Sequence, residues 1–281
     1  MENGVMELSI GNGTESFEII LSNLDKKIVL LMQVLQPNFR PYLHPIRPID
    51  GSFVITEDSP QHHNWQHGLY FGLHGVNGSG FRLDKGDKVG SFKGTKLENI
   101  EAKNDSVKWV VSTNWVHHQG HLLFKEMQTW HLVLKGDQYY LDVEFKLIAI
   151  TNITIDKNQY GGLFLRMPWR KDVNSLAINS NGEINKDAEQ KSAKWVDITM
   201  LWPEHSKANG FLKNPKNIGF PNYWRVDGNF GIGPSYVIRG PIQLAKDEEL
   251  LLAYRLVVHE GYLEKNETEK LYQSFEREIN D

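Results

Sequence analysis

The chain has 281 residues, of which 40% are hydrophobic, 11% aromatic and 23% charged. This composition excludes a disordered, collagen-like or coiled-coil protein, and the length suits one large domain with a substantial core. The 31 Lys and Arg residues against 35 Asp and Glu residues give a net charge of −4, so the sequence carries no basic footprint for nucleic acid.

The sequence lacks cysteine, long apolar runs and a recognisable export signal. It contains no cysteine, which rules out disulfides, thiolate zinc sites and cysteine nucleophiles. Its longest apolar runs, Lys27–Leu35 and Leu250–His259, fall short of the roughly 20 residues of a membrane-spanning helix. Residues 1–7 have no basic or apolar region of an export signal. We therefore expect a cytoplasmic protein if this is the native start, and a periplasmic one if a signal peptide has been removed.

Most of the chain alternates between apolar and polar residues, which is the period of half-buried strands. The clearest example is Tyr140–Leu147, which places Leu, Val, Phe and Leu on one face. Turns at Gly120 and at Gly136-Asp137 indicate consecutive antiparallel strands. In chain order, the predicted strands are Phe17–Leu21, Ile28–Gln36, Gly68–Leu73, Ser106–Val116, Leu122–Leu134, Tyr140–Leu147, Gly162–Met167, Ser235–Arg239 and Leu250–Val258.

The C-terminal stretch Lys265–Ile279 has a helical period, because Leu271, Phe275 and Ile279 recur every four residues. We expect Asn266 to cap this helix. No linker, break in composition or repeat divides residues 1–281. The sequence therefore predicts a single all-β domain of antiparallel strands with a short C-terminal helix at about 265–279, built as two packed sheets or a barrel.

The histidines are unevenly placed, since nine of the 11 lie between positions 44 and 131. The densest group is the segment 61–78, where a polar loop with His63, Trp65 and His67 runs into an apolar strand followed by His74. This composition is poor for a core and favours a functional loop. The alternative is a set of turn and edge-strand histidines that bond to backbone carbonyls.

Two further histidine-bearing segments are ambiguous. Residues 40–48, which include His44, are held extended by three prolines, and Arg40 and Arg47 could clamp an anion or be ordinary surface charges. His118 lies where the strand Ser106–Val116 ends, which favours a solvated hairpin tip over a site residue.

Two later segments also combine charge with aromatic residues. Arg166 lies in the middle of an apolar strand, and a buried arginine is costly unless it is paired or faces a polar ligand, so a site residue is favoured over a structural salt bridge. Tyr223, Trp224 and Arg225 lie in a Gly-rich stretch, where the aromatic faces could stack on a sugar or pack as a corner. His259 closes the last strand.

No G-x-S-x-G, Walker, G-x-G-x-x-G or H-E-x-x-H motif occurs, so serine-triad hydrolysis, nucleotide binding and zincin chemistry are poorly supported. The motifs that do occur are, in chain order, Arg40-Pro41-Tyr42, Trp65-Gln66-His67-Gly68-Leu69, Val76-Asn77-Gly78, Gly162-Leu163 with Arg166, Tyr223-Trp224, and Tyr254-Arg255 with His259-Glu260-Gly261. Together they resemble the bacterial PmoA-like family over residues 28–262. The resemblance implies a galactose-mutarotase-like β-supersandwich, a fold that presents one concave sheet to a sugar, in proteins of polysaccharide-degrading bacteria.

The resemblance implies a carbohydrate partner, and a uronate-containing oligosaccharide suits the residues best. Our first hypothesis is a lyase or dehydratase that works by β-elimination, which needs a cation for the carboxylate, a base and an acid. The predicted catalytic residues are His63, His67, His118 and Tyr223, and the predicted substrate-binding residues are His44, Arg47, Trp65, His74, Arg166, Trp224, Arg225 and His259. This hypothesis requires Arg166, His67 and Tyr223 to face one cavity.

Three alternatives stay open at this point. A mutarotase or epimerase would need a carboxylate base, for which Glu260 is the candidate. A noncatalytic carbohydrate-binding protein would need only the aromatic faces. A metalloenzyme would use histidine ligands chosen from His62, His63, His67 and His118. We predict no cofactor, no metal, no nucleic-acid partner and no membrane partner, with a histidine-bound divalent metal as the alternative.

Overall fold

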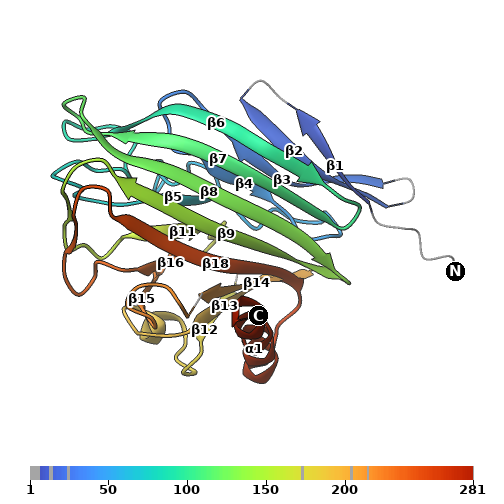
Figure 1. Ribbon diagram of the computed structural model, residues 1–281. Helices are drawn as coiled ribbons and strands as arrows, with labels where there is room; N and C mark the ends of the chain where they lie inside the picture. The colour runs from blue at the N-terminus through green and yellow to red at the C-terminus, as the bar shows by residue number, and fades with distance from the viewer. Residues whose placement is uncertain are drawn as a thin grey trace, which may run out of the picture.

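The computed structural model describes residues 7–12, 15–23, 26–171, 174–202, 205–213 and 215–280. Within these ranges, two eight-stranded antiparallel sheets pack face to face (Figure 1). The first sheet has the order β1 (Glu7–Asn12), β2 (Ser16–Asn23), β3 (Lys26–Val34), β4 (Tyr42–Ile46), β5 (Leu69–Gly72), β11 (Gly162–Arg166), β16 (Gly231–Ser235) and β15 (Tyr223–Val226).

The second sheet contains the longest strands of the described chain. Its order is β12 (Asn174–Asn179), β13 (Trp195–Trp202), β14 (His205–Lys213), β18 (Glu249–Glu260), β9 (Gln138–Ala149), β8 (Leu122–Lys135), β7 (Ser106–Val116) and β6 (Ser91–Ala102). The remaining elements are the strand pair β10 (Ile153–Ile155) and β17 (Ile242–Leu244), the 3₁₀ turn η1 (Asn185–Ala188) and the helix α1 (Lys265–Asn280). The prediction of an all-β, antiparallel protein with a C-terminal helix is confirmed.

The main core lies between the two sheets. The predicted alternation of β9 is confirmed, because Val143 and Phe145 point into this core while Glu144 between them is exposed. Phe145 stacks on Phe71 of β5, with ring centroids 4.4 Å apart, so side chains of the two sheets interdigitate. Burial of such large apolar side chains supplies most of the stabilisation of a sandwich of this kind.

The first sheet is covered on its outer face as well. Along β5 and β11, Leu69 and Leu163 point into the main core, whereas Tyr70 and Phe164 belong to a separate cluster on the opposite face. Tyr42 of β4 joins them. This outer aromatic cluster is the floor on which the candidate site is built.

The helix α1 packs on the second sheet, where Tyr272 and Phe275 contact Trp195 and Val257. In Figure 1 the helix lies at the end of that sheet formed by β13, β14 and β18. The helix begins at Lys265 as expected, but the cap is Glu264 rather than Asn266, because Glu267 accepts a hydrogen bond from the Glu264 backbone N–H at 2.9 Å.

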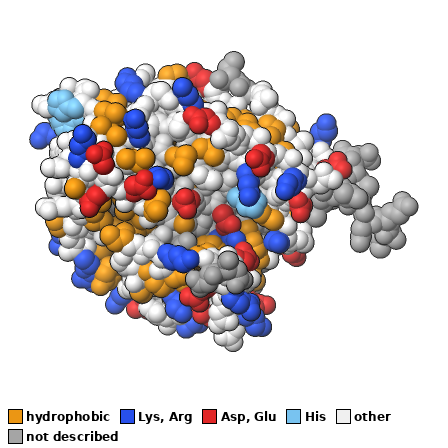
Figure 2. Space-filling model, viewed as in Figure 1, with side chains coloured by type: hydrophobic (Ala, Val, Ile, Leu, Met, Phe, Trp, Pro, Cys, Tyr) orange, Lys and Arg blue, Asp and Glu red, His pale blue; other side chains and the backbone are white. Residues whose placement is uncertain are grey.

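The molecular surface shown in Figure 2 carries positive and negative side chains intermixed with hydrophobic ones. Among the described residues, no helix combines the length and the apolar character that crossing a membrane requires.

Candidate functional site

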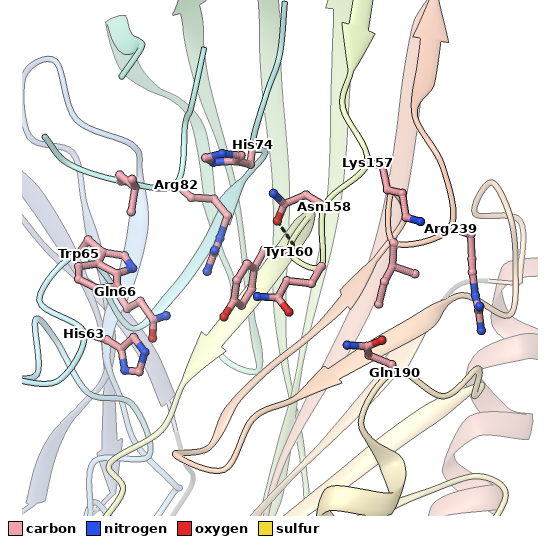
Figure 3. Close-up of a pocket in the computed structure, with 13 residues that line it drawn as sticks. His63, Trp65, Gln66, His74, Arg82, Lys157, Asn158, Tyr160, Gln190 and Arg239 are labelled. Atoms are coloured by element: carbon pink, nitrogen blue, oxygen red, sulfur yellow. Dashed lines mark hydrogen bonds between the residues drawn. The ribbon is translucent and has the colours of Figure 1, made fainter. Parts of the chain in front are cut away.

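A pocket of about 820 Å³, which we call the Arg82 pocket, opens beside the outer aromatic cluster (Figure 3). Five loop segments line it, each next to a strand or the 3₁₀ turn. The lining residues are His63, Trp65 and Gln66 before β5, His74, Arg82 and Leu83 after β5, Lys157–Tyr160 before β11, Gln190 after η1, and Ile238 and Arg239 after β16.

Arginines and aromatic rings alternate on the floor of the pocket. The Arg82 guanidinium carbon lies 3.8 Å from the ring centroid of Tyr160 and 5.2 Å from that of Phe164. Arg225 stacks on the same Tyr160 ring at 4.6 Å. Such cation–π contacts hold the guanidinium groups in place without neutralising their charge.

Four arginines are buried in the described part of the chain, and three of them have a carboxylate partner. The partners are Asp84 for Arg40, Asp227 for Arg166, and Asp142 with Glu278 for Arg255. Arg82 is 5% exposed and has no carboxylate partner among the described residues. Its Nη2 donates to the Tyr70 hydroxyl at 3.3 Å. A buried, uncompensated guanidinium at a pocket wall is suited to bind an anion bidentately.

The remainder of the lining supports anion binding. Lys157 and Arg239 add two further cations, and no Asp or Glu is among the described lining residues. The amides of Gln66, Asn158 and Gln190 provide donors and acceptors for hydroxyl groups. The pocket is therefore complementary to a small anion that carries hydroxyl groups.

Two histidines of the pocket are held neutral near pH 7. Burial, followed by the positive charge of Arg166, lowers the pKa of His63. Burial, followed by the charge of Arg82, lowers the pKa of His74. The Nδ1 atom of His63 is buried and has no hydrogen-bond partner in the described chain. Because a neutral imidazole has one unprotonated ring nitrogen, His63 can accept a proton.

Tyr160 provides a hydroxyl group to the same pocket. Arg225 Nη2 donates to the Tyr160 oxygen at 3.3 Å, which leaves the phenolic hydrogen free to be donated to a ligand. Figure 3 shows the hydroxyl end of Tyr160 pointing toward the side of the pocket where Gln66 and His63 lie. A neutral imidazole and a phenolic hydroxyl on one pocket are groups that can serve as a general base and a general acid.

His67 lies outside the pocket lining and is committed to carboxylates at both ring nitrogens. Nδ1 bonds to Asp58, and Nε2 bonds to Asp84 at 2.9 Å. Burial would lower the pKa of His67, but the hydrogen bonds to the two carboxylates outweigh it and raise that pKa. Asp84 also binds Arg40, which donates to the backbone carbonyl of Trp65. His67 is thus a cation that positions the wall of the pocket, and it has no free nitrogen to act as a base.

The structure brings three predicted residues, His63, Trp65 and His74, together in the Arg82 pocket. Two other residues that we expected to bind substrate, Arg166 and Trp224, are buried in the interior. Arg166 is fully buried and is held by Gln66, Asp227 and the Asn229 carbonyl, so it positions Gln66 instead of meeting substrate. Trp224 is also fully buried and donates its indole N–H to the Ala193 carbonyl at 2.9 Å, which leaves no face for a sugar.

The other predicted residues are dispersed. His44 and Arg47 line a separate cavity of about 790 Å³, which we call the His44 cavity. His118 is at the exposed β7–β8 hairpin tip and bonds to Ser79 at 2.7 Å. His259 belongs to the second sheet, where it bonds to the buried Asp197 at 3.0 Å.

Tyr223 and Arg225 lie at the margin of the site without lining the Arg82 pocket. The Arg239 guanidinium stacks on the Tyr223 ring at 3.9 Å, and Arg225 pairs with Glu189. None of Arg166, His67 and Tyr223, which we expected to face one cavity, is among the described residues that line the Arg82 pocket.

Sequence reasoning missed the residues that give the pocket its charge, namely Arg82, Lys157 and Arg239, and it missed Tyr160. One signal was available, since Arg82 follows Phe81 in an apolar, Gly-rich segment much as Arg166 follows Leu165. Among the described residues, no group of three or more His, Asp or Glu side chains is arranged to hold a metal ion.

Comparison with solved structures gives distant similarities. An alpha-galactosidase from Lactobacillus brevis is 10% identical, with a TM-score of 0.42 over 92% of this chain and 39% of that chain. A galactose mutarotase-like protein from Lactobacillus casei ATCC 334 is 8% identical, with a TM-score of 0.39 over 90% of this chain and 100% of that chain. A galactose mutarotase-related enzyme from Lactobacillus acidophilus is 8% identical, with a TM-score of 0.37 over 91% and 100% of the two chains.

The chain spans about two fifths of the length of the alpha-galactosidases that it matches, 39% of one and 42% of the other. A comparison with curated proteins gives no match. The resemblance to the PmoA-like family stays a prediction. Residues 32–273 match the model of a family described as "Family of unknown function (DUF6807)", and the chain therefore belongs to that family.

Proposed function

We propose that the protein binds a sugar acid in the Arg82 pocket and acts on it as a carbon–oxygen lyase by β-elimination. The observation that carries the proposal is the buried Arg82 guanidinium, which has no carboxylate partner in the described chain and lines a pocket with two further cations. A carboxylate on the ligand would supply the missing counter-charge in a bidentate pair.

The hydroxyl groups of a sugar also suit this lining. Trp65 offers a flat aromatic surface, and the amides of Gln66, Asn158 and Gln190 can bond to hydroxyl groups. A uronate combines a carboxylate with several hydroxyls on one ring, so its chemistry matches the cations and the amides together. A neutral sugar would leave Arg82 uncompensated.

β-Elimination assigns one task to each reactive group of the pocket. His63 takes the proton from the carbon next to the carboxylate, and the C–H electron pair forms a carbon–carbon double bond. The bond from the adjacent carbon to its oxygen breaks, and that oxygen receives a proton from Tyr160 and leaves as water or an alcohol. Arg82 stabilises the negative charge that develops on the carboxylate in the transition state.

The alternative of a mutarotase or epimerase is less well supported by the same lining. That reaction needs a carboxylate base, as stated above, and Asp and Glu do not occur among the described lining residues.

The binding half of the proposal is tested by isothermal titration calorimetry with glucuronate, galacturonate and the corresponding neutral sugars. We expect the acids to bind and the neutral sugars not to bind, and Arg82→Gln to weaken acid binding by about tenfold or more. Arg82→Lys keeps the charge but loses the bidentate geometry, so its affinity for the acids should lie between those of the wild type and Arg82→Gln. Arg47→Gln in the His44 cavity should bind like the wild type.

Loss of acid binding in Arg47→Gln, with full binding in Arg82→Gln, would move the site to the His44 cavity and overturn this assignment.

The elimination step is tested separately, by the absorbance of unsaturated uronate during incubation with uronate-ended oligosaccharides. His63→Ala and Tyr160→Phe should abolish the absorbance increase while retaining acid binding. Binding of acids by the wild type without any absorbance change across the panel would exclude the elimination step.

A further inference from the structure

A second pocket of about 460 Å³ adjoins the first, and we call it the Phe230 pocket. Its lining residues include Lys186, Glu189, Arg225, Asp227 and Phe230. None of these residues makes or breaks a bond in the proposed elimination at the Arg82 pocket, although Arg225 positions Tyr160. The question is what kind of group this second pocket would hold.

The two pockets share a wall. Glu189 lines the Phe230 pocket, and its chain neighbour Gln190 lines the Arg82 pocket. Arg225 lines the second pocket and contacts Tyr160 of the first, both by stacking at 4.6 Å and by the 3.3 Å hydrogen bond. The Gln190 backbone N–H donates to the Trp224 carbonyl at 2.8 Å, which fixes this wall to the edge strand β15.

The pockets differ in charge. The Arg82 pocket has three cations and no carboxylate among its described lining residues, whereas the Phe230 pocket has two cations and two carboxylates. The carboxylates of the second pocket are already satisfied, because Glu189 accepts from Arg225 and the Val226 N–H, and Asp227 accepts from Arg166. The second pocket is therefore neutral overall, and the Phe230 ring is its main apolar surface.

Each of the two pockets has a strained residue in its lining, Gln190 in the first and Phe230 in the second. Apart from Asn and Asp, the non-glycine residues with positive φ in the described chain are Ser59, Gln190 and Phe230. Phe230 has a φ of 57°, an unfavourable conformation for a bulky residue. The turn is held by Asp227, whose carbonyl accepts from the Phe230 N–H at 3.0 Å and whose carboxylate accepts from the Gly231 N–H at 2.7 Å. Strain that the surroundings enforce in this way is typical of functional sites.

From these observations we infer that the Phe230 pocket is a second subsite, which binds a neutral sugar unit linked to the acidic unit in the Arg82 pocket. The apolar face of a pyranose would stack on the Phe230 ring, as sugars do on aromatic side chains. The ligand is then an acidic oligosaccharide of at least two units. This inference rests on the proposed function, because it takes the acidic unit as the anchor.

The test compares free glucuronate and galacturonate with disaccharides in which each is linked through its anomeric carbon to a neutral hexose. By titration calorimetry, we expect the better disaccharide to bind wild-type protein about tenfold more tightly than its free acid. Phe230→Leu, which keeps apolar volume but removes the ring, should reduce this advantage to about threefold or less without changing the affinity for the free acid. Phe230→Tyr, which keeps the ring, should retain the affinity advantage of the disaccharide over the free acid.

The outcomes separate the two proposals. If the free acids do not bind, the proposed function fails and the subsite fails with it. If they bind but neither disaccharide binds more tightly, or if Phe230→Leu keeps the full advantage, the subsite is overturned while the Arg82 pocket stands. Circular dichroism of each variant confirms that a lost advantage does not come from a misfolded protein.

Discussion

At the scale of single residues, the partner of a charged group decides its role, and that partner is often far away in sequence. Arg82 and Arg166 both follow apolar residues, and both are buried. Arg166 is neutralised by Asp227, which lies 61 positions along the chain, while Arg82 has no such partner in the described residues. Local sequence could therefore identify a buried arginine, but it could not tell which one was free to bind a ligand.

Replacement of His67 tests its role as a cation between two carboxylates. Because the pKa of His67 is raised on folding, its stabilising effect is complete below the unfolded value of about 6.5 and is lost as the pH rises through the folded value. His67→Ala should therefore lower the free energy of unfolding by about 2 kcal/mol at pH 6 and by less at pH 9. Urea unfolding at the two pH values measures this difference.

The matched control is His121→Ala at the exposed hairpin tip, which should change stability little at either pH. An equal loss of stability at pH 6 and pH 9 in His67→Ala would show that the charge of His67 does not bind Asp58 and Asp84 together.

At the scale of elements, β9 was predictable from its own sequence, whereas the exposed edge strand β6 was not. β9 alternates cleanly because its inner face lies on the core. β6 was not predicted, since it is an edge strand with exposed residues on both faces along most of its length. The conformation of β6 is set by its pairing with β7. Its own sequence has no alternation of apolar and polar residues that would predict a strand.

The expected strand Ser235–Arg239 is wrong beyond its first residue for a similar reason. β16 ends at Ser235, where its neighbour β15 begins with Tyr223 as the partner of Ser235. Its other neighbour, β11, pairs only with Gly231 and Ile232. Beyond Ser235 the backbone bonds of Tyr236 to Gly161 and of Asn158 to Val237 do not continue the strand ladder, so the chain leaves the sheet and Arg239 reaches the pocket.

Docking of α1 gives a prediction at this scale. Phe275 is buried against Trp195 and Val257, whereas Glu278, its neighbour on the same helix, forms a half-exposed ion pair with Arg255. Phe275→Ala should lower the free energy of unfolding by about 3 kcal/mol. Glu278→Gln should cost less than about 1 kcal/mol, because ion pairs near the surface contribute little.

Guanidinium denaturation of the two variants against the wild type makes the comparison. A larger loss in Glu278→Gln than in Phe275→Ala would mean that the Arg255 ion pairs, rather than apolar packing, hold the helix on the sheet.

At the scale of the whole molecule, the site is assembled from five segments between positions 63 and 239. The sequence indicated two of them, the histidine-rich loop before β5 and His74 after it, because the composition of residues 61–78 is unusual for a core. The other three carry ordinary loop residues. The pairing of β5 with β11 and of β11 with β16, and the bond of Gln190 to Trp224 of β15, bring them together. Composition and periodicity are local signals, so they predicted the type of fold but not the membership of the site.

A buried carboxyl group in the core between the sheets should make the free energy of unfolding depend on pH. Glu126 is fully buried, and its burial raises its pKa to about 7 even though it accepts hydrogen bonds from Trp115 and Gln128. A carboxyl group with a raised folded pKa stabilises the protein below its unfolded value of 4.5, and this contribution is lost as the pH rises to 7. The free energy of unfolding should fall over this range by about 3 kcal/mol at most.

Glu126→Gln should flatten this part of the stability profile, while Glu144→Gln on the exposed side of β9 should leave it as in the wild type. Thermal unfolding in buffers between pH 4.5 and pH 8 measures all three proteins. The idea of a buried, titrating Glu126 fails if the Glu126→Gln profile keeps the slope of the wild type.

Strands and connecting segments contribute different parts of this protein. The strands supply the packed interior, whereas Arg82, Lys157 and Arg239 all come from connecting segments. Connecting segments accept substitution and changes of length with little cost to the packed interior. Substitutions in these segments can therefore change the charge of the pocket while the packed sandwich keeps its structure.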